Sequence, residues 1–151
     1  MTLTDAQAAE AMRAHHDEMA TELRQRIAAL GVAAGSGEPH ADAQRAVLDY
    51  LDGELVPHAL AEERALYPAG DTGLVALLVR AMRNEHVDLI AHVETFRDAS
   101  TALEAVATSS AILALFESHL AKENDLLVPA LVADPDVSLG ELLGGMHELL
   151  S

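Results

Sequence analysis

The chain has 151 residues, of which half are hydrophobic and 3% are aromatic, so it can form one domain around an aliphatic core. It has no cysteine, which excludes disulfides, thiolate metal sites and a cysteine nucleophile. The net charge of −16 argues against binding to nucleic acid or to an anionic membrane surface. No apolar run is long enough to span a membrane, and residues 1–10 do not resemble a signal peptide, so we expect a cytoplasmic location.

The first predicted helix begins at Thr4, because Thr4-x-x-Gln7 has the pattern of a capping box. Apolar residues then recur at spacings of three and four as far as Leu30, and His16 lies within this stripe. We expect the helix to stop at Gly31 and a loop to follow over residues 35–39.

A second helix is predicted over residues 40–67, with a stripe that includes His58 and Glu62. Pro57 lies inside it, removes one backbone hydrogen bond and crowds the carbonyl of Gly53, four residues back. We therefore expect a kink just before His58, and residues 68–70 should end the helix.

The third predicted helix begins near Asp71 or Thr72, carries His86 in its apolar stripe and fades over residues 99–110. The fourth carries Ile112, Phe116, His119 and Glu123, with Pro129 near its end, and Ser138-x-x-Glu141 opens a short last helix to residue 150. Strand-like alternation is not found over any useful length.

These elements predict an all-α, up-down-up-down four-helix bundle over about residues 4–131, with a short C-terminal fifth helix over about 138–150, in a single domain of residues 1–151. For His86 to lie level with Glu62, part of residues 68–77 must be a loop or a separate turn. For the same reason the third helix should end well before Ser110.

Each of the four long helices places a histidine on its inward stripe, and two add a glutamate four residues later, on the same face. The candidate metal ligands are His16, His58, Glu62, His86, His119 and Glu123. A buried imidazole or carboxylate without a partner costs several kcal/mol, and a metal cluster removes that cost. Nitrogen and oxygen ligands favour iron, manganese or zinc.

The same six side chains could hold two ions, because two bridging carboxylates would give each ion two nitrogens and two oxygens. Positions left open on such ions are where small molecules react. The alternatives are exposed His–Glu pairs for the second and fourth helices and an ordinary core histidine for His86. His15 could replace His16, although His16 fits the stripe better.

In these motifs the sequence resembles the hemerythrin-like, or HHE cation-binding, family. The matching segments are His15-His16, His58-x-x-x-Glu62-Glu63 with Leu66-Tyr67-Pro68, Glu85-His86, and His119-x-x-x-Glu123 with Leu126-Leu127-Val128-Pro129. The resemblance covers about residues 8–131.

The resemblance implies a four-helix bundle with a non-heme diiron centre: two iron ions with a bridging oxo or hydroxo oxygen. Glu62 and Glu123 would bridge the irons, with His16 and His58 on one iron and His86 and His119 on the other. Such a centre would bind dioxygen, sense oxygen or iron, or react with peroxide or nitric oxide.

The sequence departs from the oxygen carriers of this family at two positions. Ile90 stands where they have a second histidine in the third helix, and Glu123 followed by Asn124 replaces their His-x-x-x-x-Asp spacing. One iron therefore lacks a protein ligand, which favours reaction over simple oxygen storage and leaves open an oxidoreductase acting on peroxide. The alternative is an iron-responsive regulatory or interaction module with a structural metal; a zinc or manganese hydrolase is less favoured.

Several other polar residues could lie near the predicted ligands or on the surface. Glu63 and Glu85 adjoin ligands and could be recruited to an open position. Tyr50 and Tyr67 are expected to pack in the core, although either could approach the site as a hydrogen-bond donor or a ligand. We expect His92 to lie on the surface, His40 to lie in a loop or at the start of a helix, and His147 to be exposed rather than to cap the bundle.

Overall fold

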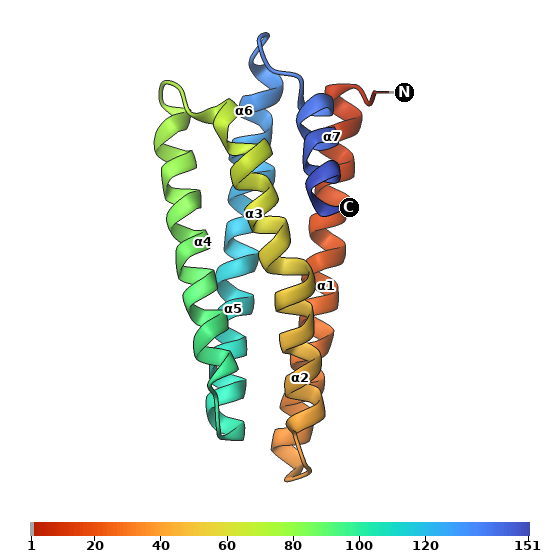
Figure 1. Ribbon diagram of the computed structural model, residues 1–151, viewed down its shortest axis with the longest axis vertical. Helices are drawn as coiled ribbons and strands as arrows, with labels where there is room; N and C mark the ends of the chain where they lie inside the picture. Colours follow the sequence, from red (N-terminus) through yellow and green to blue (C-terminus); the bar gives the residue numbers. More distant parts are fainter. Residues whose placement is uncertain (1) are drawn as a thin grey trace.

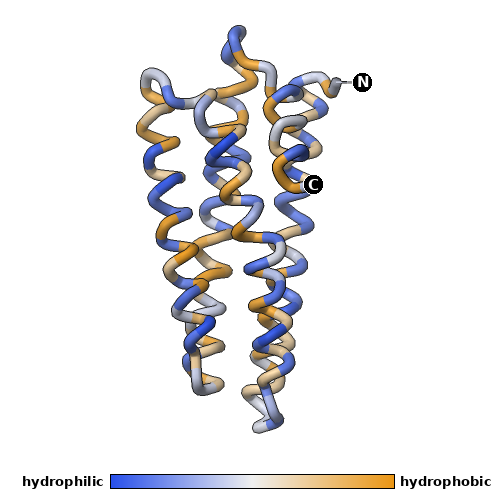
Figure 2. Tube along the Cα trace, viewed as in Figure 1, coloured by the Kyte–Doolittle hydropathy of each residue, from blue (hydrophilic) through white to orange (hydrophobic). Residues whose placement is uncertain are grey.

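The computed structural model describes residues 2–151 and confirms the all-α prediction (Figure 1). Within these residues there is no β-strand, and the α-helices are α1 (Asp5–Ser36), α2 (Ala41–Tyr50), α3 (Val56–Ala65), α4 (Val75–Arg97), α5 (Ala102–Lys122), α6 (Val128–Ala133) and α7 (Leu139–Leu150). Helix α1 packs against α2 and α5, and α5 packs against α4, so the helices form a bundle. Figure 2 shows hydrophilic and hydrophobic residues interspersed along each long helix, as expected for amphipathic helices around a core.

Helix α1 begins at the predicted capping box, in which the Thr4 hydroxyl accepts a hydrogen bond from the Gln7 backbone N–H. The prediction that it stops at Gly31 is wrong, because the helix continues to Ser36. A glycine inside a helix costs only about 1 kcal/mol relative to alanine and does not force an end. The helix ends where Gly37 adopts a left-handed conformation with φ of 71°, which glycine allows without strain.

Two π-helical turns interrupt the bundle, at Leu51–Leu55 between α2 and α3 and at Glu123–Leu127 between α5 and α6. Both are followed by a Val-Pro pair, Val56-Pro57 and Val128-Pro129, and each valine N–H bonds to the carbonyl five residues back. The wider turn accommodates a proline that lacks an N–H and crowds the preceding turn. The irregularity predicted before His58 is therefore present, and the chain changes direction between α2 and α3 (Figure 1).

The connections on either side of α4 follow the predicted spacing of the ligands. A 3₁₀ turn, Tyr67–Gly70, and a short loop precede α4, which begins at Val75 rather than near Asp71. Helix α4 ends at Arg97, well before Ser110. Helix α5 begins as early as Ala102, because Thr101 and Glu104 form a capping box that the apolar periodicity did not reveal.

The last helix, α7, begins as predicted at Ser138, whose hydroxyl accepts a hydrogen bond from the Glu141 N–H. It packs against α3 and α1. At Gly140 a Cβ atom would lie 2.2 Å from the carbonyl oxygen of Leu3, so only glycine allows α7 to approach the start of the chain this closely.

The buried apolar side chains form two clusters along the bundle. One contains Met19, Leu30, Leu55, Phe96 and Phe116, and the other contains Met12, Leu66, Met82, Leu127 and Leu131. On α1 and α4, His16 and His86 lie in sequence between members of the two clusters, so a polar layer separates two apolar cores. Among residues 2–151 no helix combines the length and apolarity needed to cross a membrane.

Candidate metal centre

All six predicted ligands are buried, and none is more than 5% exposed. Helix α1 supplies His16, α3 supplies His58 and Glu62, α4 supplies His86, and α5 supplies His119. Glu123 is the first residue of the second π-helical turn. The apolar stripe of each helix points these side chains inward, and the His-x-x-x-Glu spacing puts each pair on one face.

Three of these side chains form a first triad. The Nε2 atom of His58 lies 2.7 Å from Oε1 of Glu62 and 3.3 Å from Nε2 of His16, and His16 Nε2 lies 3.5 Å from the same glutamate oxygen. Three ligand atoms grouped so closely can hold one metal ion.

A second triad shares Glu62. Its other oxygen, Oε2, lies 3.4 Å from Nε2 of His86, which lies 3.0 Å from Nε2 of His119. The Glu62 carboxylate thus faces a pair of histidines with each oxygen. Glu123 stands beside the second triad, with Oε2 at 3.4 Å from His119 Nε2.

Three of the four histidine rings have a hydrogen-bond partner at Nδ1, the nitrogen that faces away from the centre. His16 Nδ1 lies 2.7 Å from Asn124 Oδ1, His86 Nδ1 lies 3.0 Å from a Glu63 oxygen, and His119 Nδ1 lies 2.8 Å from a Glu85 oxygen. Since these partners accept hydrogen bonds, each Nδ1 carries a proton, which leaves the Nε2 atom of each ring as the one that can bind a metal ion at the centre. This arrangement is typical of metal-binding histidines.

The sequence did not identify these supporting roles. Glu63 and Glu85 were considered only for an open ligand position, yet their carboxylates lie behind the rings, and Glu85 also pairs with Lys122. Asn124 was noted only as a departure from the family pattern, yet it is buried against His16. Their positions depend on the π-helical turn and on the rotation of the helices about their axes, neither of which the residue pattern indicates.

The convergence of lone pairs shows that the site fits a cation. In the pairs His16–His58 and His86–His119 the Nε2 atoms are 3.3 and 3.0 Å apart. Two facing lone pairs at such distances repel unless a cation or a proton lies between them. Oε1 of Glu62 and Oε2 of Glu123 are also buried without a hydrogen-bond donor, and a metal ion would satisfy both.

The charges of the site lead to the same conclusion. Burial opposes ionisation of Glu62, but the charge of His58 and contacts with His16 and His86 hold its pKa well below the usual value. Burial and the charge of Glu62 raise the pKa of Glu123. Burial lowers the pKa of His16, but the contact with Glu62 and the charge of Glu123 outweigh it and raise this pKa to about 9. The site thus favours positive charge at its centre.

Tyr67 reaches the centre, contrary to the expectation that core packing is its main role. Its ring is fully buried, but its hydroxyl lies 3.2 Å from Nε2 of both His86 and His119 and donates to Glu123 Oε1 at 3.4 Å. Burial and the charges of Glu62 and Glu123 raise the pKa of this phenol. Tyr50 turns elsewhere and donates to the carbonyl of Met19.

The remaining histidines lie outside the two triads. The His15 ring is centred 5.2 Å from that of His58, in a pocket beneath α7 rather than at the centre. His147 lines the same pocket and is exposed, as predicted. His92 bonds to the carbonyl of Asp88 on its own helix, and His40 precedes α2 without a side-chain capping bond.

Comparisons with known proteins support this reading at the level of the family. The family model described as "Hemerythrin HHE cation binding domain" matches residues 7–137, which is most of the chain. Comparison with curated proteins gave no match, and comparison with solved structures gave none either. The match extends over all five elements that carry the buried histidines and glutamates, and the chain therefore belongs to the hemerythrin HHE cation-binding family.

Proposed function

We propose that the chain is a non-heme diiron protein that binds dioxygen or a related small oxidant, for sensing, storage or removal of peroxide or nitric oxide. The observation that carries this proposal is the position of Glu62, whose two oxygens face two separate pairs of histidines. One carboxylate shared in this way supports a two-ion site over a single ion. We also propose that the bundle has the up-down-up-down four-helix topology.

In this proposal His16 and His58 would hold one iron and His86 and His119 the other. Glu62 would be shared between the two ions, and Glu123 would stand beside the second, where its Oε2 atom lies 3.4 Å from His119 Nε2. The irons would exchange electrons with dioxygen, peroxide or nitric oxide. The protein would keep bulk water out, since all six side chains are buried between two apolar clusters. Asn124, Glu63 and Glu85 would fix the ring orientations.

Tyr67 is the residue best placed to supplement the ligands of the second ion. The oxygen carriers have a histidine where this chain has Ile90, and the Tyr67 oxygen lies beside both His86 and His119. Burial opposes loss of the phenol proton, but a bound cation would favour it. We therefore propose Tyr67 as an additional oxygen ligand of the ion held by His86 and His119.

The test is the metal content and absorption spectrum of protein expressed in iron-replete medium and examined without and with air. About two irons per chain and a spectrum that changes on exposure to dioxygen, peroxide or nitric oxide would support the proposal. Fewer than about one metal per chain would overturn it. A phenolate band that Tyr67→Phe abolishes, while the iron content remains, would support the role of Tyr67; a band unchanged in that variant would refute it.

The second candidate is an iron-responsive regulatory or interaction module with a structural metal. The burial of all six ligands favours it, because a closed site is typical of structural metals. In that case removal of the metal should unfold the bundle, and no small oxidant should alter the spectrum. Rapid release of oxygen from added peroxide would instead indicate an oxidoreductase.

A further inference from the structure

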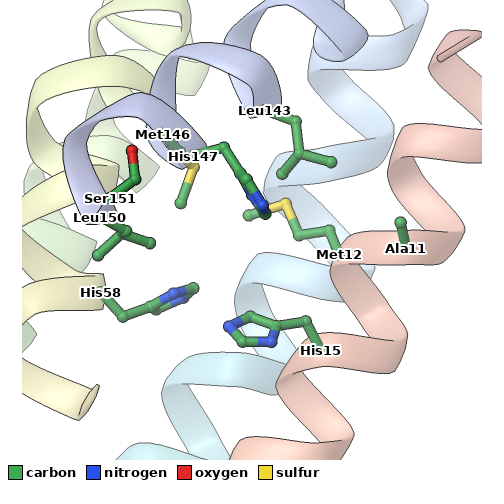
Figure 3. Close-up of a pocket in the computed structure, with 9 residues that line it drawn as sticks. All are labelled: Ala11, Met12, His15, His58, Leu143, Met146, His147, Leu150 and Ser151. Carbon is green, nitrogen blue, oxygen red and sulfur yellow. The ribbon is translucent and has the colours of Figure 1, made fainter. Parts of the chain in front are cut away.

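A pocket of about 310 Å³ lies between α1, α3 and α7, and its lining includes His58 of the candidate metal centre (Figure 3). The rings of His58 and His15 face one another on one side of it, and α7 covers the other side with Leu143, Met146 and His147 (Figure 3). Its volume is at the lower end of the range for small-molecule sites.

His58 differs from the other three histidines of the centre. Its Nδ1 atom is buried and has no hydrogen-bond partner, whereas His16, His86 and His119 each have one. His58 also lines the pocket, whereas those three rings do not. A molecule that enters the pocket and displaces the side chains covering this atom could provide the hydrogen-bond partner that the protein does not supply.

The chemistry of the neighbouring rings indicates which partner fits. When a metal ion occupies the Nε2 atom of His58, the proton of the neutral ring lies on Nδ1, which then needs a hydrogen-bond acceptor. The acceptor is a carboxylate for His86 and His119 and the Asn124 amide oxygen for His16. The pocket also offers the imidazoles of His15 and His147 as donors, and no Asp or Glu side chain lines it.

The apolar residues that line the pocket indicate what the rest of a bound ligand should be like. Met12, Leu143, Met146 and Leu150 form an apolar wall, so an uncharged, hydrophobic body is favoured over a polar one. We propose that this pocket binds a small monocarboxylate with an apolar body, whose carboxylate accepts a hydrogen bond from His58 Nδ1 and thereby completes the support of this metal ligand. The inference rests on the proposed metal centre, because a metal at Nε2 is what fixes the proton on Nδ1.

Isothermal titration calorimetry of the iron-loaded protein with benzoate tests the proposal, with benzamide as the uncharged analogue. We expect one benzoate per chain with a dissociation constant below roughly 1 mM, and binding of benzamide at least about tenfold weaker. Leu143→Trp should fill the pocket and weaken benzoate binding at least about tenfold. Leu77→Trp is the matched control, because Leu77 is exposed on α4 and does not line this pocket. Leu150→Trp is a second pocket-filling variant if Leu143→Trp does not fold.

The absorption spectrum provides a second readout, because a carboxylate on His58 should shift the bands of the loaded centre and should not do so in Leu143→Trp. Benzoate binding that survives both pocket-filling variants would locate it at the ions themselves and overturn the proposal. Equal affinity for benzoate and benzamide, or no binding, would also overturn it. Metal content is measured first on the same samples, so that failure to take up iron, which refutes the proposed function, is distinguished from failure of the pocket.

Discussion

Replacement of Glu62 by glutamine should weaken the binding of both metal ions at once. Glutamine keeps the shape of the side chain but removes its charge, and the two oxygens of Glu62 face both triads. Loss of an outer partner of a metal ligand commonly lowers affinity 10–100-fold, so loss of a charged oxygen in the triads should cost about 100-fold, or about 2.7 kcal/mol, for each ion. The total for two ions is then about 5 kcal/mol per chain.

Glu123→Gln is the matched comparison, because the polar contacts of the Glu123 oxygens are with His119 and Tyr67, on the side of the second ion. Protein loaded anaerobically with ferrous iron would be equilibrated with a competing chelator, and retained iron measured by elemental analysis. We expect Glu62→Gln to retain less than about one iron per chain and Glu123→Gln to retain more than that. Circular dichroism of the metal-free variants establishes that they remain helical. If Glu62→Gln retains as much iron as Glu123→Gln or the parent chain, the reasoning from the shared carboxylate is refuted.

Three further predictions concern the surroundings of the centre. Asn124→Ala, which removes the acceptor behind His16, should lower iron affinity about 10–100-fold in a chelator competition, whereas Asp125→Ala, at an exposed neighbour, should leave it unchanged. The pKa of His16 is raised to about 9, so below that pH a metal ion must displace a proton from this ring. Iron affinity should therefore rise roughly tenfold per pH unit between pH 7 and 9 and then level off. An iron affinity that does not change with pH would contradict this prediction. Thr101→Ala should remove the cap of α5 and lower stability by about 1 kcal/mol, seen as a lower melting temperature that exposed Thr21→Ala does not reproduce.

The sequence revealed the parts of the site that depend on periodicity. His16, His58, His86 and His119 each lie in an apolar stripe, and a stripe faces the core whatever the precise ends of its helix. The loop before α4 could also be predicted, because His86 must lie level with Glu62. Thr101 was missed as the start of α5 because the residues after it are small and show no clear apolar period, although its capping pattern with Glu104 was readable.

Other features could not be read from the chain. Pro57 indicates that the helix is disturbed, but not that the backbone adds a residue to one turn rather than bending. The roles of Asn124 and Tyr67 depend on how neighbouring helices are rotated about their axes, which a stripe defines only broadly. The Tyr67 hydroxyl reaches the centre and the Asn124 amide oxygen reaches the outer nitrogen of His16, although both residues are consistent with ordinary core positions in the sequence.

The π-helical turn at Leu51–Leu55 affects which way the side chains of α3 face, because α3 continues directly from this turn. Each residue of an α-helix advances about 100° around the axis, so one extra residue in a turn offsets the faces before and after it. Gly53 lies within this turn and is exposed, and a Cβ there would meet nothing within 4 Å. Loss of this single residue would preserve the composition of the core, yet the turn would then have to close as an ordinary α-helical turn for His58 and Glu62 to stay aligned with His16, His86 and His119. The direction in which His58 and Glu62 point thus depends on the number of residues in the turn before them as well as on the identity of these two residues.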